Sequence, residues 1–223
     1  MNQRQLLHRP LNAQNQKDNT LLMVQMAMLI AISSVLVFIC FPLVPGATFL
    51  KYDMADVPVL LCAFTMGPVP GLLVLGIASF IQAFLFGHDG PIGFLMHMIA
   101  SGTLVLVAYG IYAGLKKHKK AMIGGLICGS LAMAAIMIPL NFIFTPKVMM
   151  NVPVGEAFRL FIDGLWGGYN PAAYSEVAVT AYAMVKGLLL VGLIPFNLLK
   201  AGLNSLLLYL VYRNLPNLIK KRG

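Results

Sequence analysis

The chain has 223 residues, of which 59% are hydrophobic and only 10% are charged, and its mean hydropathy is +0.83. This composition excludes an ordinary soluble domain, in which about a quarter of the residues are charged. The formal net charge of +9 would favour a nucleic-acid partner in a soluble protein. Here the cations lie between apolar segments, so we expect them to orient the chain in a lipid bilayer and expect no nucleic-acid partner.

Apolar segments account for most of the chain, and a bilayer crossing takes about 20 residues. They predict an all-α membrane protein, a bundle of six transmembrane helices. The predicted spans are Leu21–Cys40, Ala55–Met66, Val69–Phe86, Ile92–Leu115, Ala121–Phe144 and Ile194–Tyr212. Around this membrane domain, residues 21–213, we expect a polar cytoplasmic tail over 1–20 and a basic cytoplasmic tail over 214–223.

The positions of the cations predict the orientation of the bundle. With six spans, one side of the membrane receives Arg4, Arg9, Lys17, Lys116, Lys117, Lys119, Lys120, Arg213, Lys220, Lys221 and Arg222. The other side receives only Lys51, Lys147, Arg159 and Lys186. Since loops rich in Lys and Arg stay in the cytoplasm, we expect both termini there.

The segment Glu176 to Gly192 is apolar enough to suggest a seventh span. It is interrupted by Lys186, and a seventh crossing would place the C-terminal basic run outside the cell. We therefore expect an extended outer loop between helices five and six. This loop would be partly helical and would lead into the last span at Pro195, since proline is favoured at helix N-termini.

The last span carries a lysine in its middle. Asn197, Lys200 and Asn204 fall within about 60° of one another around a helix. A charged side chain at membrane depth costs at least about 2.5–3.5 kcal/mol, so it normally faces a partner, a cavity or a ligand. This face is either a binding site or a set of hydrogen bonds to neighbouring helices.

Three further polar residues are predicted on the outer side. Asn141 lies near the outer end of the fifth span, and Lys51 and Asp53 lie in the first outer loop. Asn141 could converge with Asn197 and Lys200 on one pocket reached from outside. The alternatives are an asparagine that bridges two helices and a solvated loop with a local ion pair.

Small residues recur four apart, as in Ala27 and Ala31 of the first span and Gly125 and Gly129 of the fifth. Such pairs let helix backbones approach closely in lipid. Packing within the chain explains most of them, and an intermolecular contact is the alternative for Ala27 and Ala31.

Catalytic motifs are missing. The chain has no His-Glu-x-x-His, Gly-x-Ser-x-Gly or Walker-type phosphate loop, and we identify no carboxylate pair within a predicted span. The three cysteines have no metal-ligand or disulfide spacing. We expect neither an enzyme nor a metal or cofactor site, and any energy for transport would come from another protein.

Several blocks of sequence together resemble one family, the riboflavin-specific S components of energy-coupling factor (ECF) transporters. These blocks are Phe49-Leu50-Lys51-Tyr52-Asp53, the following Asp56-Val57-Pro58, Phe64-x-x-Gly67-Pro68 and Ile194-Pro195-Phe196-Asn197-Leu198-Leu199-Lys200-Ala201-Gly202-Leu203-Asn204. The resemblance covers about Leu21 to Arg213. It implies a six-helix protein of the cell membrane that captures a vitamin from outside and docks on a transmembrane T component bound to two ABC-type ATPases.

The resemblance also implies roles for particular residues. Asn141, Asn197 and Lys200 would hold the flavin ring of riboflavin or a related flavin, and Asn204 shares their face. Lys51 and Asp53 would contact or cover the ligand, and Ala27 and Ala31 would dock on the T component. The alternatives are an S component for another vitamin, a membrane scaffold protein and an intramembrane enzyme.

Overall fold

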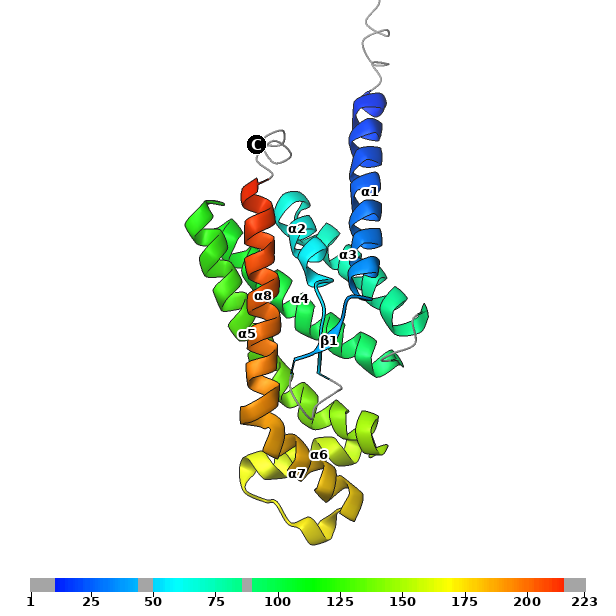
Figure 1. Cartoon of the computed structure of the whole chain (residues 1–223), viewed down its shortest axis with the longest axis vertical. Helices are drawn as coiled ribbons and strands as arrows, with labels where there is room; N and C mark the ends of the chain where they lie inside the picture. Colours follow the sequence, from blue (N-terminus) through cyan, green and yellow to red (C-terminus); the bar gives the residue numbers. More distant parts are fainter. Residues whose placement is uncertain (1–10, 44–49, 86–89, 215–223) are drawn as a thin grey trace, which may run out of the picture.

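The computed structural model describes residues 11–43, 50–85 and 90–214, and it describes the side chains of α1 from Asp18 onward. Within these ranges the chain is almost entirely helical, with one short antiparallel hairpin (Figure 1). The elements are α1 (Leu11–Leu36), β1 (Phe41–Pro42), β2 (Lys51–Tyr52), α2 (Asp56–Met66), α3 (Pro68–Phe80), η2 (Ile81–Leu85), α4 (Gly90–Gly114), α5 (Lys119–Met150), α6 (Val154–Trp166), η3 (Pro171–Ala173), α7 (Glu176–Leu188), η4 (Leu189–Leu193) and α8 (Ile194–Asn214).

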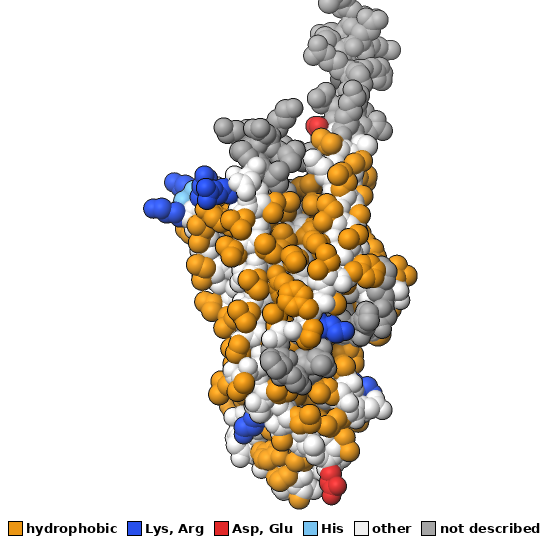
Figure 2. Space-filling model, in the orientation of Figure 1, with side chains coloured by type: hydrophobic (Ala, Val, Ile, Leu, Met, Phe, Trp, Pro, Cys, Tyr) orange, Lys and Arg blue, Asp and Glu red, His pale blue; other side chains and the backbone are white. Residues whose placement is uncertain are grey.

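Five described helices are long and apolar enough to cross a membrane. They are Asp18–Leu36, Pro68–Leu85, Gly90–Gly114, Lys119–Met150 and Glu176–Asn214, and the apolar helix α2 is shorter. Figure 2 shows hydrophobic side chains over most of the visible face, as expected where lipid rather than water surrounds the protein. A mostly helical chain with several apolar helices confirms the prediction of an all-α membrane protein.

The first helix begins at Leu11, ten residues before the predicted span, so residues 11–20 of the predicted tail are helical. Pro10 directly precedes the helix, and no proline or glycine follows before its end. With no residue to stop it, the helix extends beyond the apolar stretch on its N-terminal side. The predicted tails over 1–10 and 215–223 lie outside the described residues.

Glycines determine how closely the helices pack. Gly67, with φ of +110°, separates α2 from α3, which begins at Pro68. Between α4 and α5, a Cβ added at Gly125 would lie 2.4 Å from the Ala108 carbonyl oxygen. One added at Gly129 would lie 2.9 Å from the Leu104 carbonyl oxygen. The Gly125 and Gly129 pair therefore serves packing within the chain.

The segment after the fifth predicted span, which we expected to be a partly helical loop, is mainly helical. Helix α5 continues through Pro146 to Met150, then α6 and α7 pack together, and α7 passes through η4 into α8. Leu160 of α6 and Ala181 of α7 are buried between these two helices. Membrane helices tolerate internal proline because neighbouring groups satisfy the freed carbonyls, so Pro139 and Pro146 do not end α5.

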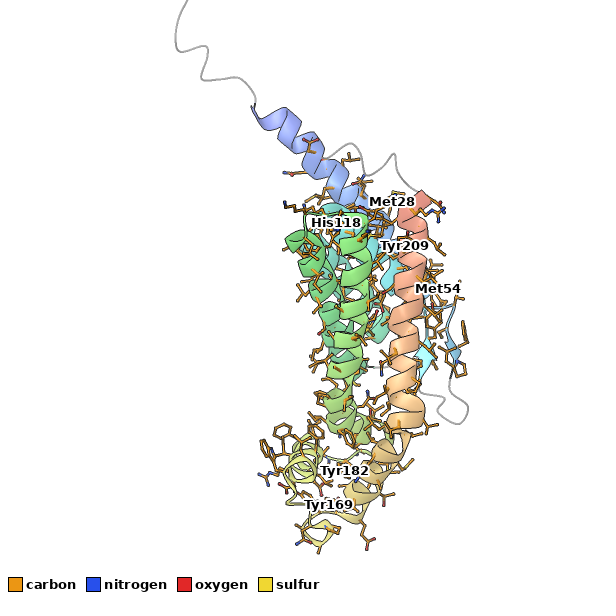
Figure 3. The ribbon with its side chains drawn as sticks, turned by 90° about the vertical axis from the view of Figure 1, so that its left-hand side faces the viewer. Met28, Met54, His118, Tyr169, Tyr182 and Tyr209 are labelled. Atoms are coloured by element: carbon orange, nitrogen blue, oxygen red, sulfur yellow. The ribbon has the colours of Figure 1, made fainter. Side chains whose placement is uncertain are left out.

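The two ends of the molecule are formed by different elements, and basic side chains gather at one of them. The described start of α1 and end of α8 lie at one end of the molecule, with α6 and α7 at the other (Figure 1). In Figure 3, His118 and Tyr209 mark the first end, and Tyr169 and Tyr182 mark the second. A cluster of basic side chains, coloured blue in Figure 2, lies at the first end, at the α4–α5 connection with Lys116 and Lys117.

Candidate functional site

The candidate site is a cavity of about 230 Å³ enclosed by the segment that follows α1, the β1–β2 hairpin, η2, α4, α5 and α8. It is lined by Val37, Cys40, Leu50, Lys51, Asp53, Gln82, Gly93, Met96, His97, Ala100, Met133, Met137, Asn141, Thr145, Val148, Met149, Phe196, Asn197 and Lys200. Apolar side chains, many of them methionines, form most of the wall, with polar groups at several points. A cavity of this composition suits a small organic molecule with a polar edge.

Helix α8 turns its polar face toward the interior of the bundle. Asn197, Lys200 and Asn204 are all buried, whereas Leu199 and Leu203 on the other side are exposed. The helix follows the π-helical segment η4, and Asn197 Nδ2 donates a 2.7 Å hydrogen bond to the Leu193 carbonyl there. This bond holds the Asn197 amide at the cavity wall.

Helix α5 presents one row of residues spaced four apart, Met133, Met137, Asn141 and Thr145, and all of them line the cavity. Asn141 Nδ2 donates to the Met137 carbonyl at 2.7 Å, and Thr145 Oγ1 donates to Asn141 Oδ1 at 2.9 Å. These bonds fix the orientation of the Asn141 amide before any ligand binds. Asn141 and Asn197 thus approach one cavity from two neighbouring helices, since α5 packs against α8.

The hairpin brings the segment between α1 and α2 to the same cavity. In β2, Lys51 is exposed and Tyr52 is buried, as expected for alternating side chains of a strand. The Tyr52 hydroxyl donates to Asn204 Oδ1 at 3.0 Å. In Figure 3 the neighbouring Met54 lies between the two ends of the molecule.

Lys200 and Asp53 form a buried ion pair, with Lys200 Nζ 2.9 Å from Asp53 Oδ2. The other carboxylate oxygen of Asp53 accepts a 3.0 Å hydrogen bond from the Ala55 backbone N–H. The lysine charge is therefore matched by a carboxylate, and the cavity lies beside the pair because both residues also line it.

A second buried carboxylate, Asp56, lies three residues after Asp53, which itself precedes α2. Asp56 begins α2 and is 1% exposed. Its Oδ1 lies 3.2 Å from His97 Nε2, and the other imidazole nitrogen, Nδ1, lies 2.9 Å from Ser79 Oγ. The sequence pattern placed both carboxylates in or next to a solvated loop, whereas the hairpin folds that loop inward.

Asn204 differs from the other predicted ligand-binding residues because it is not among the residues that line this cavity. Its Nδ2 donates to the Asp53 carbonyl at 3.2 Å and to Asp56 Oδ2 at 3.4 Å. Asn204 therefore connects α8 to the hairpin and to α2. Lys51, Asp53, Asn141, Asn197 and Lys200 do line the cavity.

Sequence reasoning missed other cavity residues, above all Thr145, Gln82 and His97. Thr145 lies four residues after Asn141, a spacing that places both on one helix face. Gln82 is, with Ser79, one of two polar residues in the third predicted span, which was a usable signal. His97 forms hydrogen bonds within the bundle and also lines the cavity.

The residues predicted for docking, Ala27 and Ala31, do not line the cavity. They are exposed on α1, which packs against α2 and α3 through its other side.

In the part of the chain that the structure describes, no group of three or more His, Cys, Asp or Glu residues could hold a metal ion.

The fold and this cavity define a helical membrane protein that encloses a site for a small, partly polar solute. Residues 21–212 match the family described as "ECF transporter, substrate-specific component". The chain belongs to this family, and the membership predicted from its sequence is confirmed.

Individual relatives share most of their length with this chain. It is 32% identical to the riboflavin transporter RibU of Staphylococcus aureus (strain TCH60), over 96% of this chain and 97% of that protein. It is 25% identical to the riboflavin transporter FmnP of Bacillus subtilis (strain 168), over 90% of this chain and 94% of that protein.

A solved structure is similar as well. It is described as "Structure and mechanism of the S component of a bacterial ECF transporter". The TM-score is 0.65 with 29% sequence identity, and the match covers 91% of this chain and 99% of that chain.

Proposed function

We propose that the protein captures riboflavin, or a related flavin, from outside the cell in the cavity between the hairpin, α4, α5 and α8. The observation that carries this proposal is the convergence of Lys51, Asp53, Asn141, Asn197 and Lys200 on one cavity. The names of the relatives in Staphylococcus aureus and Bacillus subtilis support the choice of ligand.

The chemistry of the wall suits a flavin. The ring system is flat and largely apolar, and thioether side chains such as Met133 and Met137 adapt to flat surfaces. The pyrimidine edge of the ring alternates hydrogen-bond acceptors with a donor, which the amides of Asn141 and Asn197 can match. Lys200 supplies a cation beside them.

We infer that the cavity widens when a flavin binds. Its volume of about 230 Å³ is below the range of about 300–1,000 Å³ that is usual for sites of drug-sized ligands. Side chains that can move lie at its wall, including Met96, Met137 and Met149. We infer that rearrangement of these methionines, together with the hairpin, admits the ring.

The transport cycle requires partners. No phosphate-binding loop occurs in the sequence, so we propose that a transmembrane T component and two ABC-type ATPases supply the energy. Ala27 and Ala31 would form part of the docking face, because they are small, four apart and exposed on α1. The basic α4–α5 connection supports a topology with six crossings and both termini in the cytoplasm.

A spectrum of the purified protein tests the proposal. Protein from cells grown with riboflavin should carry flavin absorbance, and the ligand-free protein should quench flavin fluorescence on titration. Parallel titrations with riboflavin and its phosphorylated form decide between these two ligands. A colourless protein with no measurable affinity for any flavin would refute the proposal.

One observation favours a scaffold as a second candidate. Lys200 and Asn204 bond to the hairpin and to α2, as they would in a protein whose polar residues only join helices. Replacing Asn197 by alanine and Lys200 by leucine separates the two functions. If the double variant is expressed at a lower level but the variant protein that is made takes up flavin normally, the scaffold is favoured.

A further inference from the structure

Gln82 is a polar side chain in an apolar stretch of the chain. It lies in η2, and its neighbours Phe80 at the end of α3 and Phe84 and Leu85 in η2 are about half exposed or more. Gln82 itself is half-buried and lines the cavity. An amide at membrane depth is costly unless it has a polar partner, and short π-helical segments occur frequently at functional sites.

The Gln82 amide has no hydrogen-bond partner among the described residues. The other polar groups near it are occupied, since both nitrogens of His97 bond to Ser79 and Asp56. Asn141 and Asn197 each use an amide N–H on a carbonyl of their own helix. Gln82 therefore offers its two donors and its acceptor to a molecule inside the cavity.

Gln82 and the two asparagines reach the cavity from different helices. Helix η2 packs against α3 and α4, whereas Asn141 and Asn197 belong to α5 and α8, which pack against each other. Met96, Met133 and Met137 supply apolar wall to the same cavity. The site thus combines two polar regions with a thioether surface.

We propose that Gln82 binds the hydroxyl groups of the polyol side chain of the flavin and selects ligands that carry this chain; this inference rests on the proposed function. When the ring edge bonds to Asn141 and Asn197, its flat body lies against the methionines. The polyol side chain on the ring then needs an uncharged partner that both donates and accepts hydrogen bonds. A primary amide has this property, and a hydroxyl group matches it.

The test compares two ligands with the same ring. Riboflavin carries the polyol chain, and lumiflavin carries a methyl group in its place. For Gln82→Leu, which keeps the size of the side chain but removes the amide, we expect riboflavin affinity to fall about 5- to 50-fold. Lumiflavin affinity should change less than about 2-fold, because the ring contacts remain.

Gln25→Leu is the matched control. Gln25 is a half-buried amide of α1 that does not line the cavity, so its replacement should leave both affinities unchanged. If Gln82→Leu does not fold, Gln82→Asn takes its place with the same expected outcome, because it draws the amide back by one methylene.

The outcomes separate this inference from the proposed function. Equal losses for both ligands, or no loss for riboflavin, would overturn the role of Gln82. Wild-type protein that binds riboflavin no more tightly than lumiflavin would also overturn it, while the proposed function would stand. Wild-type protein that binds neither ligand would refute the proposed function itself.

Discussion

Lys200 in the middle of α8 and Asp53 behind the hairpin form an ion pair with a 2.9 Å separation. They are 147 residues apart in sequence, and the pair attaches the segment between α1 and α2 to α8 at the edge of the cavity. Each charge has a partner of opposite sign in the bundle. The hairpin is therefore part of the binding site and not only a connection above it.

Replacement of Lys200 by methionine should destabilise the protein strongly. The variant leaves the buried Asp53 carboxylate without its cation, which costs about 3–5 kcal/mol in measured buried pairs. The double variant Lys200→Met with Asp53→Asn should recover much of this loss. Thermal unfolding in detergent measures both effects. Lys186→Met, at an exposed position on α7, is the control. An equal loss of stability in the single and double variants would show that Lys200 and Asp53 do not stabilise each other.

Asn197 and Asn204 should respond differently to alanine substitution. Asn197→Ala removes a cavity amide that bonds only within its own helix among the described residues, so flavin affinity should fall about 10-fold with a small change in stability. Asn204→Ala breaks bonds to Tyr52, Asp53 and Asp56. It should reduce stability by about 2–4 kcal/mol.

Paired titration and melting experiments distinguish these two effects. Tyr52→Phe, which removes only the hydroxyl that bonds to Asn204, should reproduce part of the Asn204→Ala stability loss. If Asn197→Ala reduced stability more than Asn204→Ala did, the two residues would have been assigned the wrong roles.

Two adjacent glycines of α5 provide a sharp test of helix packing. Gly125→Ala would place a Cβ 2.4 Å from the Ala108 carbonyl oxygen, and overpacking of this kind costs about 1–3 kcal/mol. At Gly124 a Cβ would meet nothing within 4 Å, so Gly124→Ala should be neutral or stabilise the helix by up to about 1 kcal/mol. If Gly125→Ala and Gly124→Ala changed the melting temperature in the same direction and by the same amount, the close α4–α5 contact would be contradicted.

Bulky residues at the proposed docking face should separate binding from transport. In a variant with Ala27→Trp and Ala31→Trp, flavin affinity should match the wild type, while ATP-driven uptake in cells with the T component and ATPases should be lost. The control is Ile32→Trp, also exposed on α1, about 100° or more around the helix from both alanines. Normal uptake in the double tryptophan variant would show that Ala27 and Ala31 are not part of the docking contact.

The sequence predicted much of the helical framework because long apolar runs have few alternatives in a bilayer. It also brought Asn141, Asn197 and Lys200 toward one site, since helical periodicity and a common outer side are local properties. The ion pair between Lys200 and Asp53 was not predicted. It depends on how the hairpin folds back between helices, and no local pattern encodes that arrangement.

Helix boundaries were the least predictable part. Helix α5 continues through Pro146 because neighbouring groups can satisfy a proline-interrupted helix in a membrane protein, although proline normally indicates an end. Asn204 was grouped with the ligand-binding residues because it shares their helix face. Its depth along α8 places it beside Tyr52 and Asp56 instead of at the cavity.

The most direct measurement fills the cavity and then titrates flavin. Met137 lines the cavity from α5, and Met137→Trp would occupy space that the ring needs, whereas Leu131→Trp adds the same side chain at an exposed position of α5. Fluorescence titration should show riboflavin affinity reduced at least 100-fold by Met137→Trp and unchanged by Leu131→Trp, with both proteins folded. Wild-type affinity in folded Met137→Trp protein would show that riboflavin binds elsewhere and would contradict the account.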